Sequence, residues 1–173
     1  MRNLIKNKRG DIPSLLISLV VILFAVGIAS MLFSKVFLDV TAEIKSQPGF
    51  SNNTINTIEK VEGKTIPLLD YLFFFSFIGI FIGLIISSIY IDVHPALMII
   101  FFIVLIITVV LAGIFANAFT EIGEQTELLS TYNQFRLTKM IMNHFGLIVF
   151  AVGILTIIVL YGKTKGGGMG GMP

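Results

Sequence analysis

The sequence contains no cysteine, and this absence excludes disulfides, thiolate metal sites and cysteine nucleophiles. Tryptophan is also missing, so tyrosine must supply any aromatic belt at a membrane surface. Charged residues make up only 13% of the 173 residues, against about 25% in ordinary soluble domains, and hydrophobic residues make up 55%. The formal charge of +2 is too small to indicate a nucleic-acid partner. This composition, with a mean hydropathy of +0.96, is typical of a chain solvated by lipid.

Charged residues and histidine are absent from two long runs, 71–91 and 95–119. Each run exceeds the roughly 18 residues that distinguish a transmembrane helix from a buried core helix. We therefore predict spans over 67–91 and 95–118, with Pro67 in the first turn of its helix. Only Asp92, Val93 and His94 separate the two spans, which predicts antiparallel helices joined by a tight turn at 92–94.

Two further apolar runs flank this pair. A basic N-terminal arm, 1–13, precedes the run 14–33, whose twenty residues rise about 30 Å in a helix, and we predict a span over 14–37. A secretory signal peptide is the competing interpretation, but the run is longer than a typical apolar signal region. The last run predicts a shorter span over 144–161, followed by a glycine- and methionine-rich tail, 162–173, which we expect to be flexible.

Polar residues fill the two longer connections. In the connection 38–66, Pro48-Gly49 predicts a turn with short helical extensions on either side. Asn52-Asn53-Thr54 in the same connection matches the pattern of a glycosylation acceptor. The connection 119–143 has apolar residues at helical spacing, which predict an amphipathic helix on the outer membrane interface: Leu128, Tyr132 and Phe135.

The predicted fold class is therefore an all-α integral membrane protein with four transmembrane helices and a tight central helical hairpin. An even number of spans puts both termini on the same side of the membrane. Basic residues are concentrated in the N-terminal arm and the tail, which predicts that this side is the cytoplasm or the interior of a membrane-bound particle. The residues expected to anchor the chain at the interfaces are Arg2, Lys6, Lys8, Arg9, Tyr71, Tyr90, Tyr161, Lys163 and Lys165.

Small residues recur at every fourth position in the second predicted span. Gly79, Gly83 and Ser87 would lie on one helix face, where small side chains let another helix approach closely. Ala112 and Ala116 form a comparable face in the third span. We interpret these five residues as a helix-packing seam, whose partner is either another span of this chain or a second copy of it.

The sequence lacks the polar residues that membrane chemistry requires. No carboxylate lies deep in a predicted span, whereas membrane hydrolases and transporters place ionisable groups there. Asp70 is expected near the positive end of a helix at the level of the headgroups. Asp92 and His94 are too few to hold a metal. We therefore predict no enzyme activity, no cofactor, no metal and no small-molecule substrate.

Three short segments carry a loose resemblance to a known class of proteins. They are Lys6-Asn7-Lys8-Arg9-Gly10-Asp11-Ile12-Pro13, Asp92-Val93-His94-Pro95 and Tyr161-Gly162-Lys163. With the whole-chain pattern, they are similar to the small multi-spanning membrane proteins of lipid-containing tailless viruses and related mobile elements. That resemblance implies a virion membrane protein that anchors the capsid or bends the bilayer.

A second resemblance covers the N-terminus alone. Lys8-Arg9-Gly10 before a long apolar run resembles the class III signal peptide of type IV pilins and archaeal flagellins, which is cut after the glycine. Leu15 stands where pilins usually place a glutamate, and three further spans follow here instead of a soluble head. A basic cytoplasmic anchor ahead of the first span is the simpler interpretation.

The function expected from the sequence is that of a structural membrane protein, a virion or membrane-assembly scaffold. Its expected partners are the lipid bilayer and either further copies of itself or other membrane and capsid proteins. One alternative is a pore-forming, holin-like or channel oligomer. The other is a membrane subunit of a secretion or pilus-type assembly complex.

Overall fold

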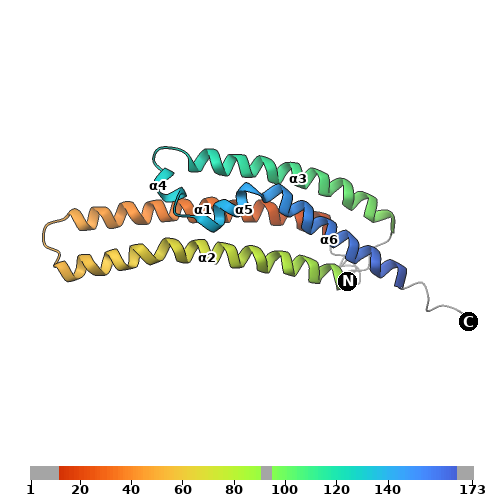
Figure 1. The fold of residues 1–173 in the computed structure, drawn as a ribbon, viewed down its shortest axis with the longest axis horizontal. Helices are drawn as coiled ribbons and strands as arrows, with labels where there is room; N and C mark the ends of the chain where they lie inside the picture. The colour runs from red at the N-terminus through yellow and green to blue at the C-terminus, as the bar shows by residue number, and fades with distance from the viewer. Residues whose placement is uncertain (1–11, 91–94, 167–173) are drawn as a thin grey trace, which may run out of the picture. The chain divides into compact units, whose positions relative to one another are not determined.

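The structure is a computed structural model that describes residues 12–90 and 95–166, and these residues form only helices and turns (Figure 1). Four of the helices are long and apolar enough to cross a membrane, which confirms an all-helical, multi-pass chain. The predicted turn at 92–94, most of the N-terminal arm and the end of the tail lie outside the described residues. The helices are α1 (Ile12–Ser46), α2 (Asn52–Tyr90), α3 (Pro95–Gly123), α4 (Leu129–Tyr132), α5 (Arg136–Asn143) and α6 (Phe145–Gly166).

The first two helices are longer than a bilayer is thick. α1 has 35 residues and α2 has 39, so they rise about 52 Å and 58 Å, against about 40–45 Å for a bilayer with its headgroups. The polar connection 38–66 is therefore mostly helical, and the chain reverses at the predicted Pro48-Gly49, where Gly49 has a φ of 121°. Ser51 caps the start of α2, because its Oγ accepts a hydrogen bond from the Thr54 amide at 3.3 Å.

The sequence predicted that Pro67 lies in the first turn of a helix, and this prediction is wrong. Pro67 lies inside α2, which begins at Asn52. A proline at this position removes one backbone hydrogen bond from the helix. Pro67 is exposed, so its ring lies on the outer face of α2.

The chain divides into two compact units. Unit 1 comprises residues 1–22, 78–114 and 145–173, and its helices α3 and α6 run antiparallel. A Cβ atom placed on Gly153 of α6 would overlap the Leu105 side chain of α3, and one placed on Gly146 would lie 3.5 Å from the Val109 carbonyl oxygen. The two glycines therefore allow α6 to approach α3 closely.

Unit 2 comprises residues 23–77 and 115–144. In it, α1 and α3 run in the same direction, and the ring of Phe24 stacks on that of Phe115 with centroids 4.5 Å apart. Gly27 is a point of close approach, since a Cβ there would lie 2.9 Å from Met142 of α5 and 3.4 Å from both Phe73 and Phe119. One glycine thus lets side chains from three other helices meet α1.

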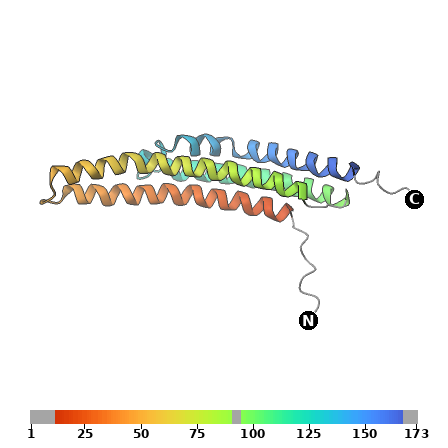
Figure 2. The ribbon, with the colours of Figure 1, turned by 90° about the horizontal axis from the view of Figure 1, so that it is seen from below.

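The described side chains are distributed as lipid solvation requires. In the most apolar 18-residue window of each spanning helix, the buried share is 33% in α1, 28% in α2, 22% in α3 and 28% in α6. Most side chains of each span are therefore half-buried or exposed. The exposed ones are mainly isoleucine, leucine, valine and phenylalanine. Several serine and threonine side chains lie on the buried stripes, where lipid does not surround them, whereas Ser18 and Ser76 are exposed. Figure 2 shows the same helices from a second direction. The buried hydroxyl residues are Ser34, Thr41, Ser88, Thr108, Thr131, Thr138 and Thr156.

Gly153 and Gly79 offer a direct test of where close packing is needed. Gly153→Val should lower the free energy of unfolding in detergent by about 1–3 kcal/mol, because Leu105 is fully buried and has little room to move. Gly79→Val is the matched control, since a Cβ at Gly79 meets no atom within 4 Å. Denaturant titration of the monomer checks both variants. Equal stability of the two variants would contradict the assigned α3–α6 contact.

Candidate functional site

Asp70 is the buried charged residue around which the polar contacts of unit 2 are built. It lies on α2 and is only 5% exposed. Its Oδ2 accepts a hydrogen bond from the Leu137 amide at 2.9 Å, and its Oδ1 accepts one from the Thr138 amide and one from Thr138 Oγ1, both at 2.8 Å. Leu137 and Thr138 belong to the first turn of α5, so Asp70 caps that helix from another helix.

The sequence of α5 explains why it needs a cap from elsewhere. The first amides of a helix have no partner within the helix, and a serine, threonine, aspartate or asparagine usually precedes them. Here the preceding residue is Phe135, which is buried and makes no side-chain cap. A carboxylate at this helix end also interacts favourably with the helix dipole. Asp70 therefore supplies both the missing acceptors and a suitably placed negative charge.

The amphipathic segment predicted between the last two spans is two short helices, α4 and α5, and its apolar face packs into the protein. Leu128, Tyr132 and Phe135 are buried rather than exposed to a membrane interface. The Tyr132 ring lies 5.8 Å from that of Phe119, and Lys139 Nζ lies 4.4 Å above the Tyr132 ring. α4 and α5 thus form part of the packed interior of unit 2.

A half-open hollow of about 430 Å³ lies beside the Asp70 cap. Asp70 and the exposed Arg136 provide one charge of each sign in its lining, and Tyr71 provides an exposed aromatic ring. We call this cavity the Asp70 hollow. Its lining residues are Pro67, Asp70, Tyr71, Asn133, Gln134, Arg136 and Leu137.

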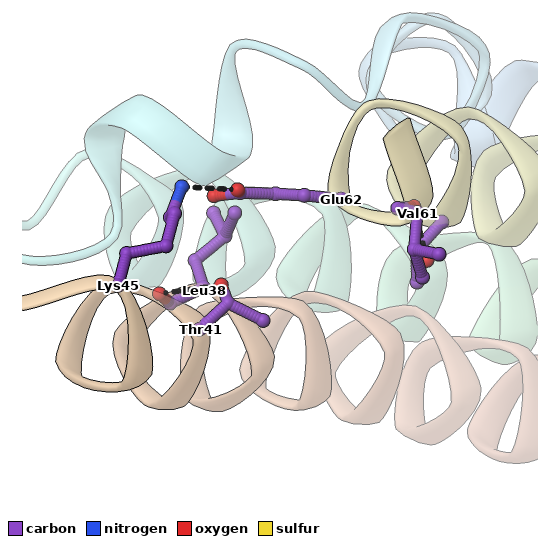
Figure 3. A network of polar contacts seen from close by, with 6 residues as sticks. Leu38, Thr41, Lys45, Val61 and Glu62 are labelled. Carbon is purple, nitrogen blue, oxygen red and sulfur yellow. Dashed lines mark hydrogen bonds and ion pairs between the residues drawn. The ribbon is translucent and has the colours of Figure 1, made fainter. Parts of the chain in front are cut away.

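The second notable feature is the polar hairpin, which we define as residues 34–65. It comprises the end of α1 after its apolar run, the turn, and the start of α2. Lys45 of α1 and Glu62 of α2 form an ion pair of 2.6 Å across it, with side chains only 25% and 21% exposed (Figure 3). Thr41 donates a hydrogen bond to the Leu38 carbonyl at 3.0 Å (Figure 3). The ion pair links the two helices beyond their apolar runs, whereas the Thr41 hydrogen bond lies within α1.

The polar hairpin also exposes apolar side chains. Val36, Val40 and Val61 are 60%, 50% and 50% exposed. A shallow groove of about 170 Å³ runs between the two helices beside Val61. The groove is lined by Phe37, Thr41, Thr57, Ile58 and Val61.

The five residues of the predicted packing seam do not form one helix–helix contact within the described chain. Gly79 and Gly83 are exposed, and a Cβ added to either would meet no atom within 4 Å. Ser87 and Ala116 are half-buried, and Ala112 is fully buried. Four other described glycines approach neighbouring helices, and the sequence argument missed them: Gly27, Gly123, Gly146 and Gly153. Gly146 and Gly153 are seven residues apart, which puts them on one face after two helical turns, and this spacing was the available signal.

The predicted interface tyrosines are all exposed. Tyr71 is 54% exposed, Tyr90 79% and Tyr161 53%, and their place at a membrane surface stays a prediction. Lys163 and Lys165 fall in the last turn of α6, whereas Arg2, Lys6, Lys8 and Arg9 lie outside the described residues. Within residues 12–90 and 95–166, no three histidine, cysteine, aspartate or glutamate side chains are grouped so that they could hold a metal.

Comparisons with protein-family models, with curated proteins and with solved structures found no match to this chain. Its function is therefore inferred from its own residues.

The Asp70 cap predicts a large effect of one substitution. Asp70→Ala should lower the free energy of unfolding by about 2–4 kcal/mol, because a helix cap is lost and buried donors are left without an acceptor. Hydrogen exchange of the Leu137 and Thr138 amides should become faster in the same variant. Denaturant titration and exchange followed by mass spectrometry measure the two effects.

Asp39→Ala is the matched control for Asp70→Ala. Asp39 pairs with Lys35 on the surface of α1, and such exposed pairs contribute about 0–1 kcal/mol. We expect unchanged exchange in α5 for this variant. If Asp70→Ala behaved like Asp39→Ala, the cap would not stabilise unit 2.

Proposed function

We propose that this chain is a non-enzymatic structural membrane protein that acts as an assembly scaffold, in the membrane of a lipid-containing virion or a related particle. The observation that supports the proposal best is the polar hairpin. Residues 34–46 of α1 rise about 20 Å and residues 52–65 of α2 about 21 Å past the apolar runs. A paired helical extension of this length presents a defined surface outside the lipid.

The chemistry of the hairpin surface suits a protein partner. Val40 and Val61 are exposed beside charged residues, in a part of the chain that is too polar to lie in lipid, and Val36 is exposed at the end of the predicted span 14–37. Exposed apolar side chains rimmed by polar residues are typical of protein contact sites. The Lys45–Glu62 pair keeps the two helices in register, so a partner need not order a flexible loop.

The charge distribution supports an orientation for this scaffold. Basic residues are concentrated in the N-terminal arm and near the C-terminus, so we place both termini on the cytoplasmic or interior side. The polar hairpin then lies on the opposite side. In a virion whose membrane lies beneath a coat, this is the side that faces the coat.

A pore-forming or channel oligomer is the second candidate. The exposed face at Gly79 and Gly83 favours self-association, because small residues let helices of two copies approach closely. A pore also needs a polar lining, and the buried Ser88, Thr108 and Thr156 each donate a hydrogen bond to a carbonyl of their own helix. The third candidate, a secretion or pilus-type assembly subunit, rests on Lys8-Arg9-Gly10, which lies outside the described residues.

The scaffold proposal is tested by separating particles and membranes from the source culture by density and analysing both fractions by mass spectrometry. We expect this chain to be enriched with a coat protein in a lipid-containing particle. Recovery only in cell membranes, without a coat protein, would contradict the proposal. Purified protein should also leave dye-loaded liposomes sealed, whereas dye release would favour the pore.

One pair of variants tests the role of the hairpin surface. Val61→Glu should reduce incorporation into particles about tenfold, since losing the burial of one valine costs about 1.5–3 kcal/mol and 1.4 kcal/mol corresponds to a factor of ten. Asn56→Glu adds the same charge to an exposed position of the same helix and should incorporate like the unmodified chain. Quantitative mass spectrometry of purified particles checks both. Equal incorporation of the two variants would show that Val61 makes no contact.

A further inference from the structure

The Asp70 hollow lies where a lipid headgroup would be expected. Its residues on α2 follow the polar hairpin directly, and Tyr71 begins the charge-free run 71–91. Exposed tyrosines gather at the level of the headgroups, with the ring near the lipid and the hydroxyl near water. Next along the membrane-spanning part of α2 come Leu72 and Phe75, which are 53% and 66% exposed. The hollow therefore opens beside a surface suited to acyl chains.

The lining of the hollow combines a cation with a carboxylate that still has one free hydrogen-bond acceptor position. Arg136 is exposed and is not needed to cap α5, and its guanidinium matches the oxygens of a phosphate group. An ionised carboxylate has about four acceptor positions. The carboxylate of Asp70 accepts three hydrogen bonds, two at Oδ1 and one at Oδ2, so one position remains at Oδ2.

We propose that the Asp70 hollow binds the headgroup of a phospholipid that carries a primary ammonium, as phosphatidylethanolamine does. The phosphate pairs with Arg136, and the ammonium donates a hydrogen bond to Oδ2 of Asp70. The amide groups of Asn133 and Gln134 complete the polar lining, and the acyl chains lie on Leu72 and Phe75. The volume of about 430 Å³ lies within the range of about 300–1,000 Å³ that ligand pockets occupy.

The same lining disfavours two other common headgroups. An anionic glycerol headgroup carries the same phosphate charge but offers no cation to pair with the Asp70 carboxylate. A quaternary choline headgroup keeps the positive charge but has no N–H to donate to Oδ2. Selectivity for the primary ammonium is therefore the distinguishing expectation.

The binding experiment uses the full chain in detergent and native mass spectrometry. It is titrated separately with phosphatidylethanolamine, phosphatidylcholine and phosphatidylglycerol of identical acyl chains, and with soluble phosphoethanolamine. We expect the first lipid to bind at least about tenfold more tightly than the other two, since the ammonium makes a charged hydrogen bond that the other headgroups cannot make. Equal binding of the three lipids would overturn the proposal. Binding of soluble phosphoethanolamine as tight as that of the lipid would assign the hollow to a free phosphomonoester instead.

Arg136→Gln and Lys60→Gln form a matched pair of variants. Both remove one positive charge from an exposed position, but only Arg136 lines the hollow, whereas Lys60 lies in the polar hairpin. Arg136→Gln should not weaken the fold, because a cation at a helix N-terminus is unfavourable. We expect the preference for phosphatidylethanolamine to be lost in Arg136→Gln and kept in Lys60→Gln. An unchanged preference in Arg136→Gln, with a normal unfolding curve, would overturn the assignment.

Discussion

The arrangement of unit 2 depends on three hydrogen bonds accepted by the Asp70 carboxylate. The first turn of α5 is partly buried, and its Leu137 and Thr138 amides donate to Asp70 rather than to a residue of their own segment. Each unsatisfied amide in such a place costs several times the net value of an ordinary hydrogen bond. Phe135 fills space but accepts nothing, so the helix end requires an acceptor from elsewhere in the fold. Asp70 thereby links α2 to a segment 67 positions further along the chain.

The fourth span has the shortest apolar run of the four. The apolar run of α6, 145–161, reaches only about 25 Å, less than the roughly 30 Å of hydrocarbon. The helix itself continues to Gly166, so its 22 residues rise about 33 Å. The backbone of the whole segment is therefore helical, and no irregular backbone has to lie in lipid, where its polar groups would find no partner.

The sequence allowed the spans to be predicted because lipid imposes a simple rule on them. Runs without charge are detectable without knowing any neighbour, and four such runs gave four helices. The long helical extensions were only partly foreseen, since the polar connection 38–66 lacks the apolar pattern that marks a span. The position of Asp70 at the level of the headgroups stays a prediction, but its role as the cap of α5 was not foreseen, because its sequence neighbours say nothing of α5. The missing local cap at Phe135 was the one sequence signal that another residue must take that role.

The spacing of glycines was the least reliable basis for predicting which helix faces pack together, and the reason is geometric. A small residue permits close approach but does not require it, so spacing alone cannot distinguish Gly79 from Gly153. The difference lies in the facing helix: Leu105 occupies the space above Gly153, whereas no described atom lies within 4 Å of a Cβ at Gly79 or Gly83. The packing of the single chain therefore requires a glycine at position 153. It gives no reason for the glycines at positions 79 and 83. A face that is kept small and left uncovered within one chain is the natural place for contact with a second copy or with lipid.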